Sequence, residues 1–128
     1  MIYLDTSVAL AQLFAEDRRP PAALWNETLV SSRLLEYELW SRIHARRLGE
    51  PLGTGARRLV SGIGLIELVP AVLARALKPF PRPVGTLDGL HLASVEFLRG
   101  LRQEVALATY DVRMAAVAEE LGIPLYRL

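Results

Sequence analysis

The sequence contains no cysteine, which excludes disulfides, zinc sites built on thiolates and cysteine nucleophiles. It also lacks any apolar run near the roughly 20 residues that a membrane span needs. No charged leader precedes the first apolar run, so the amino terminus is typical of a buried strand rather than of a signal peptide. Together these absences predict a cytoplasmic protein without membrane contact.

Lysine is almost absent as well. Of the 15 basic residues only Lys78 is a lysine, and the others are arginines, which are the better bidentate ligands of phosphate. The net charge is only +1, so the chain as a whole is not a polycation. Its 128 residues are 52% hydrophobic and contain no linker or low-complexity tract, which predicts a single domain over residues 1–128.

Short apolar runs alternate with stretches of helical periodicity along the whole chain. We expect strands at 1–4, 28–31, 66–69, 103–109 and, at the edge of the sheet, 124–128. We expect helices at 8–15, 21–26, 33–48, 54–61, 70–77, 88–101 and 112–121, with a turn at 49–55 and a stiff proline loop at 78–83. Strands joined through helices favour the α/β class, as a three-layer α/β/α sandwich with a mostly parallel central sheet.

Three of the four aspartates lie at the start of a predicted helix, namely Asp5, Asp88 and Asp111. Any one of them could simply cap its helix, because aspartate is a favoured N-cap residue. Ligands in open α/β sheets bind where strands end and helices begin, however, so the repetition favours a shared site. Glu38 is a fourth candidate, because a helical wheel turns it towards the apolar face and turns Glu36 outward.

These acids would need a positive partner. An inward glutamate costs several kcal/mol unless it is paired or bound to a metal. If the four acids converge, their repulsion must be offset, and no lysine stands nearby to do so. A divalent cation is the natural solution, since carboxylate oxygens are preferred ligands of Mg²⁺ and Mn²⁺. Arg42 beside Glu38 and Arg82 in the proline loop are candidates for binding the phosphates of RNA.

Four short motifs carry a resemblance to a known family. They are Leu4-Asp5-Thr6-Ser7, Ser31-Ser32 followed by Glu38-Leu39, Thr86-Leu87-Asp88-Gly89-Leu90-His91-Leu92-Ala93, and Ala108-Thr109-Tyr110-Asp111. With these motifs the chain resembles, over nearly its whole length, the PIN-domain ribonucleases and in particular the VapC-type toxins of toxin–antitoxin pairs. One departure is Gly89, where many relatives have alanine.

The resemblance implies a Mg²⁺- or Mn²⁺-dependent ribonuclease whose products carry 5′-phosphate and 3′-hydroxyl ends. The family's catalytic and metal-binding acids fall on Asp5, Glu38, Asp88 and Asp111. The hydroxyls that would support them are Thr6, Ser7 and Thr109. The implied partners are an RNA substrate, a VapB-like antitoxin and a second copy of the chain in a homodimer.

Three alternatives remain open from the residues alone. A metal-free ribonuclease could use His44 and His91 as acid and base, although a packed or hydrogen-bonded helix histidine is the commoner role for His91. A phosphoryl-transfer domain would need a second acid near the first strand, where the chain has Ser7, and a lysine in its site. A catalytically silent PIN scaffold would only bind RNA or protein, but the presence of all four acids argues against it.

Overall fold

The sheet at the centre of the molecule has four strands. The computed structural model describes residues 1–128. Its strands are β1 (Ile2–Leu4), β2 (Leu29–Ser32), β3 (Gly64–Ile66) and β4 (Ala106–Ala108). They lie in the order β3-β2-β1-β4, and every pairing between neighbours is parallel. The predicted α/β class with a mostly parallel sheet is therefore confirmed.

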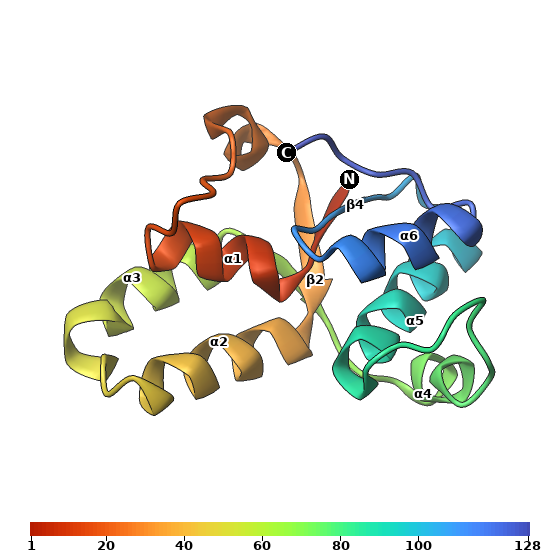
Figure 1. The fold of residues 1–128 in the computed structure, drawn as a ribbon, viewed down its shortest axis with the longest axis horizontal. Coiled ribbons are helices and arrows are strands. Elements are labelled where there is room, and N and C mark those ends of the chain that lie inside the picture. Colours follow the sequence, from red (N-terminus) through yellow and green to blue (C-terminus); the bar gives the residue numbers. More distant parts are fainter.

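Helices cover both faces of this sheet. They are α1 (Thr6–Leu13), the short 3₁₀-helix η1 (Ala22–Asn26), α2 (Arg33–Ala45), α3 (Gly49–Ser61), α4 (Pro70–Ala76), α5 (Thr86–Gly100) and α6 (Val112–Glu120). Figure 1 shows the sheet edge-on in the middle, with α1, α2 and α3 on one side and α4, α5 and α6 on the other. This arrangement is the predicted three-layer sandwich. None of the helices has the length and apolar character needed to cross a membrane.

The alternating side chains of β1 contribute to a separate core on each face. Ile2 and Leu4 pack with buried residues of α1 and α2, whereas Tyr3 packs with buried residues of α5 and α6. Successive side chains of a strand point to opposite faces, so three consecutive buried residues supply both cores. Helices therefore pack on both faces of β1, and this packing fixes the position of its carboxyl end.

The order of the strands reverses beside β1. β2 and β3 follow on one side of it, and β4 lies on the other. In open α/β sheets such a switch point forms a crevice outside the carboxyl ends of the strands, where ligands bind. Here the crevice lies between the ends of β1 and β4, where the backbone N–H of Asp5 donates to the carbonyl oxygen of Ala108 over 3.0 Å.

The predicted turn at 49–55 is wrong, because the whole segment belongs to α3. Pro51 lies in the first turn of the helix, where its missing N–H has no helical acceptor to lose. The glycines in the segment allow close packing: a Cβ on Gly53 would come within 3.4 Å of the Trp40 ring. Small side chains therefore let α3 approach α2, and this tertiary contact outweighs the low helix propensity of glycine.

The other differences from the predicted elements are smaller. α2 ends earlier than expected, and Arg47 leaves it with a left-handed φ of 56°. The third strand, Gly64–Ile66, shares only Ile66 with the predicted 66–69, so the prediction is wrong for 67–69. The last segment forms only a parallel bridge between Leu107 and Leu125 instead of an edge strand, and Pro124 in this segment has no N–H to donate to a ladder.

Candidate active site

Asp5 directly follows β1 and occupies the N-cap position of α1. It is buried, yet its side chain accepts no hydrogen bond from the backbone of that helix. Its Oδ2 instead accepts one hydrogen bond from the Ser7 hydroxyl at 2.7 Å and another from the Thr109 hydroxyl at 2.8 Å. Asp5 is therefore not a helix cap, and two of the hydroxyls singled out in the sequence orient its carboxylate.

The same two hydroxyls hold the loop that follows β4. The Ser7 oxygen accepts a hydrogen bond from the backbone N–H of Tyr110 at 3.0 Å. The Thr109 oxygen accepts one from the backbone N–H of Asp111 at 2.9 Å. Each hydroxyl thus donates to Asp5 and accepts from the loop, so the ends of β1 and β4 form one connected network.

Glu38 reaches the same region from α2. Its Oε1 is hydrogen-bonded to the Thr6 hydroxyl at 2.9 Å and to Nε2 of His91 at 2.7 Å. Glu36 points outward and pairs with Arg33 over 3.4 Å. The helical wheel therefore identified the inward acid correctly, and the Thr6 hydroxyl helps to orient it.

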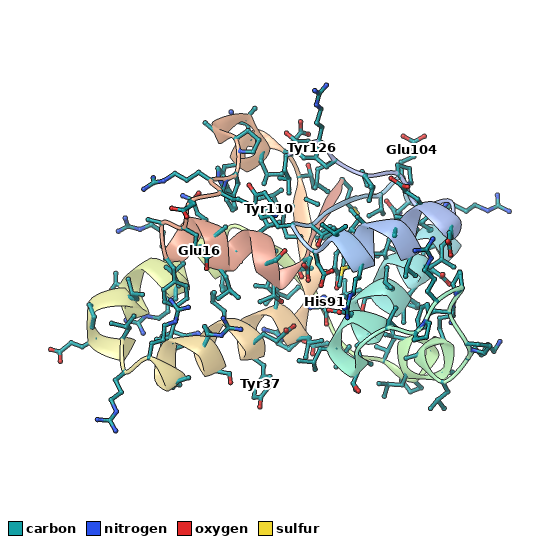
Figure 2. The ribbon with its side chains drawn as sticks, viewed as in Figure 1. Glu16, Tyr37, His91, Glu104, Tyr110 and Tyr126 are labelled. Atoms are coloured by element: carbon teal, nitrogen blue, oxygen red, sulfur yellow. The ribbon has the colours of Figure 1, made fainter.

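A buried histidine joins these groups, although the sequence suggested it only for the metal-free alternative or as a packed or hydrogen-bonded helix residue. His91 on α5 is 1% exposed, and its Nδ1 lies 2.7 Å from the Tyr3 hydroxyl oxygen. Its Nε2 lies 2.7 Å from Glu38 Oε1 and 4.0 Å from Asp5 Oδ1. Figure 2 labels His91 near the middle of the molecule, where α5 approaches the other helical layer. One feature of the sequence indicated that His91 lies near the site: it follows Asp88 by three positions, and two such residues share one face of a helix.

Asp88 lies in the first turn of α5, and no hydrogen-bond donor of the chain is bound to its side chain. Burial first, and after it the negative charges of Asp111 and Asp5, raise the pKa of this carboxyl to about 6. The charge of Glu38 acts likewise. A carboxylate that only stabilised the helix dipole would have a lowered pKa. Asp88 is thus placed where other acids repel it.

Asp111 is the one predicted acid that does cap its helix. Its Oδ1 accepts hydrogen bonds from the backbone N–H groups of Arg113 at 2.9 Å and Met114 at 3.1 Å, at the start of α6. The explanation by capping therefore holds for Asp111 and fails for both Asp5 and Asp88.

All four carboxylates keep at least one oxygen without a hydrogen bond. These oxygens are Oδ1 of Asp5, Oε2 of Glu38, both oxygens of Asp88 and Oδ2 of Asp111. None of them is sealed away from solvent, and no arginine or lysine forms an ion pair with any of the four residues. Free carboxylate oxygens are what Mg²⁺ and Mn²⁺ prefer, so the chemistry of the donor set fits such an ion.

The predicted convergence of the acids is nevertheless only partial. As the side chains stand, no three acidic or histidine groups lie close enough together to hold a metal ion jointly. Closing the site on an ion therefore requires side chains to rotate. Asp88 has the greatest freedom to do so, because no hydrogen bond fixes its carboxylate.

The two arginines that the sequence suggested for phosphate binding lie in different surroundings. Arg82 forms an ion pair with Glu120 of α6 over 2.7 Å. Arg42 lines a hollow of about 360 Å³ whose wall also includes Ser7 and Tyr110, so this hollow adjoins the acids. Figure 2 shows Tyr110 on the α1 side of the molecule, above that helix.

Sequence reasoning did not single out Arg18, which stands at the same place. It lines the hollow with Arg42 and a neighbouring hollow of about 410 Å³ that includes Thr109 and Asp111. Its guanidinium donates to the carbonyl oxygen of Tyr110 at 3.4 Å and lies 5.8 Å from the centre of that ring. An exposed arginine and an aromatic ring therefore border the acids on this side.

Comparisons with known proteins agree with this geometry. The model of the PIN domain family matches residues 2–120, a range that includes all four acids. "Ribonuclease VapC47" of Mycobacterium tuberculosis (strain CDC 1551 / Oshkosh) is 32% identical, over 95% of this chain and 93% of its own length. "Ribonuclease VapC35" of the same organism is 29% identical, over 96% of this chain and 93% of its own length.

Proposed function

Because the chain belongs to the PIN-domain family, we propose that it is a metal-dependent ribonuclease that hydrolyses RNA phosphodiester bonds. Both relatives carry the name ribonuclease and align with nearly the whole chain, which supports a nuclease activity. We further propose that the protein acts as the toxin of a toxin–antitoxin pair, in accordance with the VapC names of these relatives.

The observation that carries the proposal is the set of four carboxylates at the carboxyl ends of β1 and β4, which have no arginine or lysine as a partner. The chain has 15 basic residues, but none of them forms an ion pair with these acids. Burial and like charges raise the pKa of Asp88 to about 6, so the ionised site is electrostatically costly. A bound Mg²⁺ or Mn²⁺ would relieve that repulsion.

In this proposal the acids divide the work according to their contacts. Asp5 and Glu38 are fixed by hydroxyl and imidazole groups and would hold the ion with their free oxygens, while Asp88 would rotate towards it and Asp111 would complete the site. When bound, such an ion lowers the pKa of a water molecule and neutralises charge on the scissile phosphate. The hydroxyl and imidazole groups orient the carboxylate ligands, and the four carboxylates keep the site negatively charged.

The RNA strand would approach along the side of the site bordered by Arg18 and Arg42. Guanidinium groups bind phosphates well, and the Tyr110 ring offers a face on which a base can stack. Arg82 would have to leave Glu120 before it could bind a phosphate, so it is the weaker of the two arginines suggested by the sequence.

A metal-free mechanism based on histidines is less well supported. His91 is 1% exposed and engaged at both ring nitrogens, so it has no face for a substrate. His44 is exposed on α2 and stacks against Trp40 with the ring centres 5.6 Å apart. An acid–base pair needs both groups within reach of one phosphate.

Two further partners belong to the proposal. A VapB-like antitoxin would bind the protein and occlude the acids, and a homodimer would form through another surface. An apolar hollow of about 660 Å³ between α4, the proline loop and the start of α5 offers a seat for a hydrophobic segment of the antitoxin, beside the strongly exposed Leu77. Light scattering of the purified chain, alone and with the antitoxin, measures both assemblies.

The function is tested by incubating the purified chain with single-stranded RNA in Mg²⁺ or Mn²⁺ and analysing the ends of the fragments. The proposal predicts cleavage that EDTA abolishes and fragments with 5′-phosphates. Cleavage that survives EDTA and leaves cyclic phosphates would instead support a histidine mechanism. A chain that folds but cleaves no RNA with either ion would be a silent scaffold.

A further inference from the structure

We propose that His91 is a positioning residue for Glu38, held by the Tyr3 hydroxyl so that its Nε2–H donates to the Glu38 carboxylate. This inference rests on the proposed function, because it matters only if Glu38 holds an ion. It adds two residues from the core, neither of which can touch the substrate, to the machinery that shapes the site.

The hydrogen-bond roles follow from the chemistry of the three groups. A neutral imidazole has one donor and one acceptor nitrogen, and an ionised carboxylate can only accept. Nε2 lies 2.7 Å from Glu38 Oε1, so Nε2 carries the hydrogen. Nδ1 is then the acceptor, and the Tyr3 hydroxyl at 2.7 Å is the donor that it faces. The relay from Tyr3 through His91 to Glu38 therefore has one direction.

This relay selects which oxygen of Glu38 is available. Oε1 is occupied by Nε2 of His91 and by the Thr6 hydroxyl at 2.9 Å, whereas Oε2 has no partner. A group that hydrogen-bonds to a metal ligand fixes the orientation of that ligand, and its loss typically weakens metal binding by about 10- to 100-fold.

The relay also connects the two helical layers across the end of β1. Glu38 comes from α2, on one face of the sheet, and His91 comes from α5, on the other. Asp88 lies one turn before His91 on the same helix. One helix therefore carries both an acid of the site and the group that orients an acid from the opposite layer, so their relative positions depend on His91.

A purely structural role is the competing explanation, because a buried hydrogen-bonded histidine also stabilises a fold. The two roles differ in what they predict for the ion. A structural role lowers the melting temperature and leaves the intrinsic affinity for Mn²⁺ unchanged in the folded protein. A positioning role weakens Mn²⁺ binding even in a variant that remains folded.

The experiment measures Mn²⁺ affinity of the free chain by calorimetric titration without RNA, alongside the melting temperature in EDTA. We expect His91→Leu to weaken Mn²⁺ binding by about 10- to 100-fold. His91→Gln keeps a side-chain N–H donor and should restore affinity to within about threefold of the wild type, with Tyr3→Phe between the two variants. His44→Gln, on the exposed face of α2, is the matched control and should bind like the wild type.

Nitrogen-15 NMR of the metal-free chain gives an independent readout, since it reports which nitrogen of His91 carries the hydrogen. The proposal predicts hydrogen on Nε2, and hydrogen on Nδ1 alone would overturn it. Wild-type Mn²⁺ affinity in folded His91→Leu would overturn it too. If His91→Leu does not fold, wild-type affinity in Tyr3→Phe together with loss of affinity in His91→Gln is the overturning result.

These outcomes separate the inference from the proposed function. Loss of Mn²⁺ binding in Asp88→Asn with unchanged binding in the His91 and Tyr3 variants would defeat the relay alone. If the folded wild-type chain shows no saturable Mn²⁺ binding, the proposed function fails, and the relay fails with it.

Discussion

The acidic side chains of this protein occupy two kinds of region that are built in opposite ways. On the surface, Glu67 pairs with Arg33 over 2.7 Å, and Glu120 pairs with Arg82 over 2.7 Å. At the carboxyl ends of β1 and β4, four acids form no ion pair with an arginine or a lysine. Arg33 lowers the pKa of Glu67, whereas burial and neighbouring acids raise the pKa of Asp88 to about 6.

The difference shows that the chain pairs its surface acids with its own arginines but does not do so for the acids at the sheet edge. Exposed ion pairs contribute little to stability, because water and salt screen them. The acids at the sheet edge are partly buried and remain uncompensated, although the chain is rich in arginine. Their hydrogen bonds to hydroxyls and to His91 orient them, and no arginine or lysine neutralises them. We infer that their counter-charge comes from outside the chain.

The largest effect is expected from removing one of the acids at the sheet edge, which lack an arginine or lysine partner. Asp5→Asn or Asp88→Asn should lower Mg²⁺-dependent RNA cleavage by about a thousandfold, since each removes a charged ligand worth several kcal/mol in the transition state. Glu36→Gln removes an acid of the surface kind and should leave the rate nearly unchanged. Single-turnover cleavage assays measure the rates. An Asp5→Asn variant as fast as wild type would remove Asp5 from the site.

A smaller effect is expected from the basic residues that border the acids. Arg18→Ala and Arg42→Ala should each weaken RNA binding by about 3- to 10-fold, with a loss that shrinks as salt is added. Each arginine change is combined with Asp5→Asn, which removes cleavage. The affinity of these double variants for labelled RNA is then measured by fluorescence anisotropy. Arg33→Ala, which disrupts only the surface pairs with Glu36 and Glu67, is the control. Equal affinities across all of these variants would exclude the proposed path of the RNA.

The smallest effect concerns stability without metal. Because the folded-state pKa of Asp88 lies above its ordinary value of 3.8, its stabilising contribution is complete below about pH 4 and is lost as the pH rises through about 6. Asp88→Asn should therefore melt about 2 °C higher than wild type at pH 7.5 in EDTA and show no such gain at pH 4.

Glu67→Gln is the matched contrast for that measurement. The pKa of Glu67 is lowered, so its contribution is present above its ordinary pKa and is lost as the pH falls. This variant should melt only slightly lower than wild type at pH 7.5, because the pair is exposed. Thermal unfolding followed by circular dichroism measures both variants. A gain in Asp88→Asn that is as large at pH 4 as at pH 7.5 would contradict repulsion as its cause.

Local patterns were sufficient to predict much of the fold and the acids of the candidate site. A strand followed by an acid and a helix can be recognised within ten residues, and the helical wheel distinguished Glu38 from Glu36. The segment at 49–55 was misassigned because its glycines face side chains of other helices, Gly53 facing Trp40 of α2 and Gly55 facing Leu13 of α1. Helix propensity depends only on the local sequence, whereas the helix at this segment is stabilised by its packing against other helices.

The relay at the core of the site lay beyond such reasoning. Tyr3 and His91 are separated by 88 positions, and their hydrogen bond depends on how α5 packs against β1. No local pattern encodes that contact. Arg18 is likewise one of 14 arginines in the sequence, and its contact with Tyr110, 92 positions away, depends on the fold.

The most direct measurement of the central claim is the melting temperature of the metal-free protein before and after adding millimolar Mn²⁺. An ion that binds only the folded state stabilises it by mass action, by about 2.7 kcal/mol at a hundred times the dissociation constant. We predict that the wild type melts several degrees higher with Mn²⁺ and that Asp5→Asn does not respond. A wild-type melting temperature that Mn²⁺ leaves unchanged, or an equal rise in Asp5→Asn, would contradict the assignment of these four acids to a cation.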